Sequence, residues 1–245
     1  MSPIDLSMEI PVSMLETLSP YTELDFALAH QVLQDPVYRD HYFARRPGRE
    51  LILDNSVHEL GAPLSIPELL HASEAVHADY LISPDKLEDS DWTIDQYNAL
   101  YAAGRRVKLA AVLTGNTLED RVKHLSRILG APMLCLPYRR PRIEWFFEQL
   151  ETITRTWNRI HLLGVSSIAE LRAWIWIADR FPNIRFSVDT SKPIKWGLLG
   201  RSLDTNESIR HAPVSSTQLL GARSVESQRI AIHENILFLR SILNP

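Results

Sequence analysis

Three aspartates lie at or just after the ends of apolar runs, where their side chains could act on a sugar and its base. They are Asp54, Asp85 and Asp189. Two carboxylates that face one anomeric carbon suit a retaining displacement, in which one attacks C1′ and the other transfers the proton of the departing or entering group. A third carboxylate could accept hydrogen bonds from the donor edge of a purine-like base. A lone aspartate at a strand end most often caps a helix or forms a turn, so it is the ordered set of three that suggests one shared pocket.

The runs before these aspartates are typical of strands in a parallel sheet, which helices cover on both faces and which therefore are almost continuously apolar. Predicted strands cover residues 8–13, 51–54, 78–82, 107–113, 132–136, 159–163, 184–189 and 210–214. Helical spacing lies between them, over 24–46 with a break at Asp35-Pro36, then over 66–76 after a cap at Ser65, 93–103, 118–129, 143–153, 168–181 and finally 225–243.

Eight strands that alternate with helices predict an α/β fold, a (β/α)8 TIM-like barrel with irregular last strands. An open doubly wound sheet is the alternative, but no glycine-rich dinucleotide loop follows any strand, which favours the barrel. In both folds ligands bind at the carboxyl ends of the strands. We expect one domain over residues 1–245, with an N-terminal strand and helices in 1–49, the core units and the site in 50–193, and a loop and helix in 194–245.

The charge balance limits how nucleic acid could be bound. The net charge is -4 and the sequence pI is about 6.1, so no overall field attracts a polyanion and local patches must hold one. The candidates for phosphate contacts are Arg139 and Arg140, with Arg142, after one strand and Lys192 and Lys195, with Arg201, after Asp189.

The single cysteine, Cys135, excludes an internal disulfide and any cysteine-cluster metal site, and we predict no cofactor and no metal. No run reaches the roughly 18 apolar residues of a membrane span, and residues 1–18 lack the pattern of a signal peptide. We therefore expect no membrane partner and a cytoplasmic location.

The ordered motifs resemble those of tRNA-guanine transglycosylases. The segment His161-Leu162-Leu163-Gly164-Val165-Ser166 is similar to a strand end that lines the deazaguanine pocket in that family, which implies base contacts from Leu163, Gly164 and Val165. The later Val188-Asp189 is similar to the strand end that carries the nucleophile, Asp54 to the acid/base carboxylate, and Asp85 to the base-binding aspartate. Thr114 stands where the family has a glutamine. The likeness extends over about residues 51–193.

Departures from the family indicate which relatives are nearest. One cysteine cannot build the family's C-terminal zinc site, and the Asp-Ser-Gly-Gly loop is Asp54-Asn55-Ser56-Val57 here. The chain looks more like the short, phage-type members, which implies a pentosyltransferase that replaces guanine in DNA with a 7-deazaguanine such as preQ0. The expected partners are DNA and that base, and a homodimer is left open. If a phage encodes the chain, the resemblance implies a location in the host cytoplasm. The alternatives are a tRNA- or nucleoside-directed transglycosylase, or an inactive barrel that binds nucleic acid in a modification complex.

Overall fold

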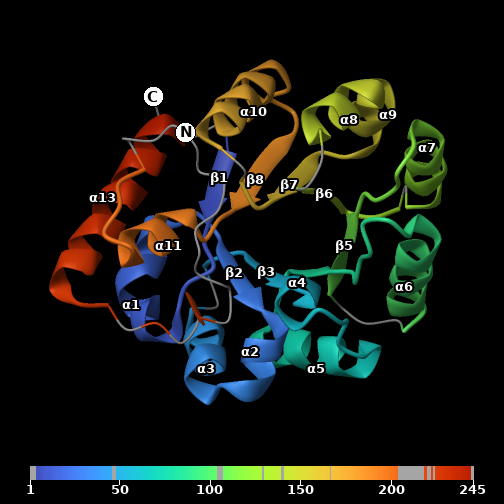
Figure 1. Cartoon of the computed structure of the whole chain (residues 1–245). Coiled ribbons are helices and arrows are strands. Elements are labelled where there is room, and N and C mark those ends of the chain that lie inside the picture. Colours follow the sequence, from blue (N-terminus) through green and yellow to red (C-terminus); the bar gives the residue numbers. More distant parts are fainter. Residues whose placement is uncertain are drawn as a thin grey trace.

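The computed structural model describes residues 4–45, 48–103, 107–128, 130–138, 141–165, 167–203, 218–219, 222 and 224–243. Eight parallel strands form one nearly closed ring with helices outside it (Figure 1), so the predicted (β/α)8 barrel is confirmed. The strands are β1 Ile4–Ser7, β2 Asp25–Leu28, β3 Leu51–Asp54, β4 Tyr80–Ile82, β5 Lys108–Val112, β6 Met133–Pro137, β7 Arg159–Leu163 and β8 Arg185–Asp189.

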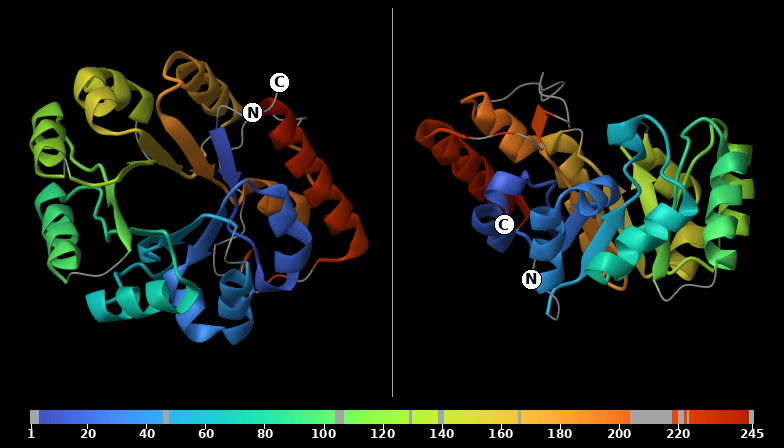
Figure 2. Two further views of the ribbon diagram at one scale, coloured as in Figure 1. Left: turned by 180° about the vertical axis from the view of Figure 1, so that it is seen from behind. Right: turned by 90° about the horizontal axis from the view of Figure 1, so that it is seen from below.

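Helices follow the strands and cover the outside of the ring, as the view from behind also shows (Figure 2). Two short 3-10 turns, Val12–Met14 and Ser19–Tyr21, lie near the amino terminus. The α-helices are α1 Leu15–Leu18, α2 Ala29–Gln34, α3 Pro36–Ala44, α4 Val57–Leu60, α5 Ile66–Val76, α6 Ser90–Ala102, α7 Leu118–Arg127, α8 Arg142–Glu148, α9 Leu150–Thr156, α10 Ile168–Arg180, α11 Lys192–Leu198 and α13 Glu226–Leu243.

The first strands differ from the prediction. The strand expected over 8–13 is wrong, because β1 lies earlier and residues 12–14 form a 3-10 turn. The helix expected from residue 24 begins instead as β2, since parallel pairing of Asp25–Leu28 with β3 outweighs the helical spacing of its apolar residues. The strand expected over 210–214 lies outside the described residues. The predicted helix over 143–153 is divided into α8 and α9 at Gln149.

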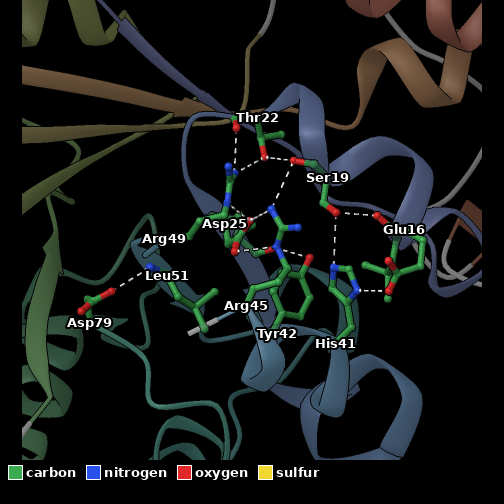
Figure 3. Close-up of polar contacts among 12 residues, drawn as sticks. Glu16, Ser19, Thr22, Asp25, His41, Tyr42, Arg45, Arg49, Leu51 and Asp79 are labelled. Carbon is green, nitrogen blue, oxygen red and sulfur yellow. Dashed lines mark hydrogen bonds and ion pairs between the residues drawn. The ribbon is translucent and has the colours of Figure 1, made fainter. Parts of the chain in front are cut away.

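The ring closes between β1 and β2 through a few hydrogen bonds. The carbonyl oxygen of Leu6 accepts from the amides of Glu23 (2.9 Å) and Leu24 (3.4 Å), and the amide of Leu6 donates to the Glu23 carboxylate at 3.0 Å. Beside this seam, the buried Asp25 carboxylate accepts hydrogen bonds from Arg45 and Arg49, each 3.0 Å from its Nε atom (Figure 3). These contacts fix the amino end of β2 against the residues that flank it.

Alternation along the strands separates the barrel interior from the helix layer. Successive side chains of a strand point to opposite faces, and the buried apolar residues accordingly form two clusters. One fills the ring and includes Phe26, Ile52 and Met133, whereas Leu53, Leu162 and Val188 pack outward against the helices. Asp54 is two residues after Ile52, and Asp189 follows the outward Val188, so both aspartates belong to the inner face.

Helix α13 packs closely against α11, and Gly197 makes this approach feasible. A Cβ atom on Gly197 would lie 2.5 Å from the amide nitrogen and 2.6 Å from the Cα atom of Ile232. Backbone atoms cannot yield as a flexible side chain can. We therefore predict that Gly197→Ala lowers the free energy of unfolding by about 1–3 kcal/mol, measured by urea denaturation.

Gly130→Ala is the matched control, because a Cβ atom there meets nothing within 4 Å. Equal stability of the two variants would contradict the tight contact between α11 and α13.

Candidate active site

Asp189, the last residue of β8, is held by two hydrogen-bond donors at the mouth of the ring. Its Oδ1 atom lies 3.1 Å from Nε2 of His161 and accepts a hydrogen bond from the amide of Gly164 at 2.9 Å. The residue is only 4% exposed. Among the described residues Oδ2 has no hydrogen-bond partner, so one oxygen of the carboxylate is fixed and the other is available to a ligand.

A buried side chain continues this arrangement into the barrel. Nδ1 of His161 lies 2.8 Å from the hydroxyl oxygen of Ser187, and both residues are 0% exposed. Serine, histidine and aspartate also form the triad of many hydrolases, where the hydroxyl is the nucleophile. Here the hydroxyl is enclosed, and only the Asp189 end reaches the mouth. The geometry therefore favours the carboxylate as the reacting group.

Asp54, the last residue of β3, lies at the same mouth. Its Oδ2 atom accepts a 2.7 Å hydrogen bond from the amide of Ser56. Burial raises the pKa of the Asp54 carboxyl well above its usual range, and the negative charges of Glu59, Asp189 and Asp85 raise it further. The protonated form of Asp54 is thus favoured, which suits a group that donates a proton.

Asp85 is joined to the β3 tip by Asn55. The Asn55 side-chain amide donates to the carbonyl of Ser83 at 2.8 Å and to Oδ1 of Asp85 at 3.2 Å, while its own oxygen accepts from the amide of Val57. Burial raises the pKa of Asp85 to about 6, although the hydrogen bond from Asn55 and the charge of His58 oppose this shift. Asp85 is therefore ionised at neutral pH and can accept hydrogen bonds.

Glu9 completes the group of acids and was missed in the sequence. Burial raises its pKa to about 8, as do the charges of Glu59 and Asp189, whereas Lys195 and a hydrogen bond with Ser191 lower it. Its Oε2 atom is shielded and has no hydrogen-bond partner among the described residues. Placing the first strand at 8–13 hid Glu9 inside a strand, whereas its position two residues beyond the end of β1 puts it at the mouth.

The predicted base-binding residues occupy different environments. Gly164 has a left-handed backbone (φ +66°), which turns its amide to Asp189, and Leu163 contacts the inner cluster while Val165 packs with the outer one. Thr114 is fully buried, with its hydroxyl 3.0 Å from Nδ1 of His124 on α7. The Thr114 hydroxyl is thus engaged with the helix layer, and its contact with a base stays a prediction.

The basic residues predicted to contact phosphates also occupy different environments. Arg139 and Arg140 lie outside the described residues. Arg142 is buried, pairs with Glu170 at 2.5 Å and donates to carbonyl groups at the tips of β6 and β7, so it serves the fold. Lys192 is partly buried and has a pKa lowered to about 8, chiefly by burial. The charge of Lys195 acts on Glu9 and Glu59, which places this lysine beside the acids.

Other features of the described residues do not add a second centre. No three His, Cys, Asp or Glu side chains of this part of the chain are arranged to hold a metal ion. No helix within the described ranges is long and apolar enough to span a membrane. A cavity of about 430 Å³ between α6 and the amino end of β5, lined by Tyr97, Tyr101 and Lys108 among others, opens at the end of the ring opposite the acids.

Comparisons with known proteins support no particular reaction. No family model matches the chain, and no curated protein matches its sequence. Solved structures with a similar course of the chain include KGPDC from Streptococcus mutans, with 12% identity and a TM-score of 0.48 over 97% of this chain and 99% of that one. The phosphoribosylanthranilate isomerases of Thermotoga maritima (11%, 0.47) and Pyrococcus furiosus (10%, 0.47) each match over 89% of this chain and 96% of their own.

The raised pKa of Glu9 predicts how stability depends on pH. The unfolded chain releases this proton near pH 4.5 and the folded chain near pH 8, so the folded state binds more protons in between and loses stability as the pH rises through that window. Glu9→Gln removes the buried charge. We expect the free energy of unfolding of this variant, measured by urea titration, to exceed that of the natural chain by about 2 kcal/mol at pH 8.5. At pH 4.5 the two values should differ little.

Glu144→Gln, on the exposed start of α8, is the control for loss of a carboxylate. If the free energies of unfolding of the natural chain, Glu9→Gln and Glu144→Gln changed with pH in parallel, folding would not raise the pKa of Glu9, and the prediction would be wrong.

Proposed function

We propose that this chain is a glycosyltransferase that exchanges guanine in DNA for a 7-deazaguanine of the preQ0 type. The observation that carries the proposal is that two inward-facing aspartates, Asp54 and Asp189, end β3 and β8 at one barrel mouth, where the charge of Asp189 contributes to the raised pKa of Asp54. The ordered motifs that resemble those of tRNA-guanine transglycosylases supply the identity of the base, and the likeness to the short, phage-type members favours DNA over tRNA.

In the first half of the reaction, Oδ2 of Asp189 attacks C1′ of the target deoxyribose. A C1′–O bond forms while the bond from C1′ to the base nitrogen breaks, and its electron pair leaves with guanine. The departing base takes up a proton from the neutral Asp54 carboxyl group, so no charge accumulates on it. The raised pKa of Asp54 is what this step needs, since the group must carry its proton near neutral pH.

In the second half the roles of Asp54 reverse. The ionised Asp54 takes the proton from the ring nitrogen of the entering deazaguanine, and that nitrogen attacks C1′. The ester bond to Asp189 breaks and its electron pair returns to the carboxylate. Two inversions at C1′ leave the original stereochemistry in place, and the enzyme returns to its starting state.

Recognition of the base and of the strand uses neighbouring groups. In this proposal ionised Asp85 accepts hydrogen bonds from the donor edge of guanine, and Tyr138, which is 43% exposed beside Gly164, offers an aromatic face. A guanine inside a duplex must leave the stack before Asp189 reaches C1′. Lys192, at the start of α11, is the described cation nearest in sequence to Asp189. In the proposed complex it binds a backbone phosphate of the nucleic acid.

A covalent adduct between protein and nucleic acid tests the proposal directly. The natural chain should form an adduct with guanine-containing DNA that survives denaturation. We expect Asp189→Asn to abolish it, because no nucleophile is left, and Asp54→Asn to slow its formation about 100-fold or more. Rates are measured on denaturing gels. Asp179→Asn, on the exposed face of α10, is the matched control and should react normally.

Substrate class is decided in the same assay with DNA, tRNA and guanosine in parallel, each with labelled free guanine. Exchange into tRNA or guanosine alone would keep the chemistry and reject DNA. An adduct that persists in Asp189→Asn would reject the nucleophile, and no exchange into any of the three would leave a binding barrel without catalysis.

The pKa of Asp85 predicts how base binding depends on pH. Its carboxyl group becomes protonated as the pH falls through about 6, and it then loses an acceptor for the donors of guanine. We expect the dissociation constant of free guanine to increase about tenfold between pH 7.5 and pH 5, measured by calorimetry. Asp85→Asn should bind weakly and show no such change. A pH-independent constant in the natural chain would contradict the role of Asp85.

A further inference from the structure

The buried contact between Asp189 and His161 has a direction that the hydrogen-bonding capacity of the groups dictates. An ionised carboxylate only accepts hydrogen bonds, and a neutral imidazole has one donor and one acceptor nitrogen. The proposed attack uses Asp189 as an ionised carboxylate, and Nε2 of a neutral His161 must then carry the hydrogen that lies in the 3.1 Å contact. Nδ1 is then an acceptor, and it accepts a hydrogen bond from the Ser187 hydroxyl, 2.8 Å away.

The surroundings leave the ring little freedom. His161 stacks on Phe26 with 5.6 Å between ring centroids and 18° between ring planes, and neither His161 nor Ser187 is exposed. Loss of the Ser187 hydroxyl would leave Nδ1 buried without its donor, which disfavours the tautomer that Asp189 requires. The serine thus acts on the carboxylate through the ring.

We propose that His161 is the positioning residue of the nucleophile and that Ser187 sets its tautomer, so that Oδ1 of Asp189 is held and Oδ2 is presented to the sugar. This inference rests on the proposed function of Asp189. No proton is transferred between Asp189, His161 and Ser187 in this arrangement. Its effect on the reaction is to hold the attacking oxygen in line and, when the ester breaks, to stabilise the negative charge that returns to the carboxylate.

Substitutions at His161 can separate position from packing. Glutamine can place an amide donor where Nε2 lies, whereas asparagine reaches only the position of Nδ1. We expect His161→Asn and His161→Phe to slow the release of the Asp189 adduct by excess free guanine about tenfold or more, and His161→Gln to recover most of the natural rate. Half-saturating guanine should change little, because the loss lies in the rate rather than in binding.

The matched control is His124→Phe, since His124 is equally buried and also contacts a residue at a strand tip. It should lower the free energy of unfolding as His161→Phe does and leave adduct release unchanged. Equal rates in His161→Gln and His161→Asn would overturn the positioning role, as would a slow release in His124→Phe of the same size.

A second measurement does not depend on catalysis. In ligand-free protein labelled with ¹⁵N-histidine, the nitrogen shifts of His161, assigned with His161→Gln, should show a proton on Nε2 and none on Nδ1. Ser187→Ala should yield a mixture of tautomers and a slower adduct release. A proton on Nδ1 in the natural chain would overturn the inference even where the adduct forms. Absence of any adduct would reject the proposed function, while the nitrogen shifts would still report the tautomer of His161.

Discussion

The alternation of side chains along parallel strands is the constraint on which this site depends. In a closed ring every second residue points inward, and the last inward residue of each strand lies at the mouth. Asp54 and Asp189 occupy such positions on β3 and β8, which are far apart in sequence but face the same space. A shift of either strand by one residue would turn its carboxylate to the helix layer. The outer packing of Leu53 and Val188 therefore secures the position of both acids.

Gathering acids in this way costs electrostatic energy, and the structure offsets it only in part. Glu9, Asp54, Glu59 and Asp85 all have raised pKa values, with burial as the main cause in each. Lys195 is the cation whose charge opposes the shift at both glutamates. Glu9 and Asp54 consequently favour their protonated forms near neutral pH, and a ligand rich in hydrogen-bond donors would relieve the remaining repulsion. Such a mouth suits a purine-like base better than a bare phosphate.

The sequence predicted the parts of the site that local pattern determines. Apolar runs that stop at an aspartate identified the tips of β3 and β8 and the neighbourhood of Asp85, because these strands are buried and uninterrupted. Glu9 and β2 were missed, since Asp5 and Ser7 interrupt the apolar residues of β1 and Asp25 begins β2, so these two strands are defined by their pairing partners rather than by an apolar run. Thr114 shows a related limit, because sequence order cannot tell whether a strand-tip side chain turns to the mouth or to His124.

His161 and Ser187 show why the function of a core residue is difficult to read from sequence. Both lie inside strands, where a histidine or serine would ordinarily be a satisfied core residue, and their proposed role arises only from pairing across β7 and β8, in which His161 is the direct neighbour of Ser187. In this register Asp189 is the next inward-facing residue of β8 after Ser187, so it lies nearer to the mouth than His161 and Ser187 do. The same geometry supports the proposed choice of reacting group, because the Ser187 hydroxyl is enclosed in the barrel, whereas Asp189 is the last residue of β8, at the mouth.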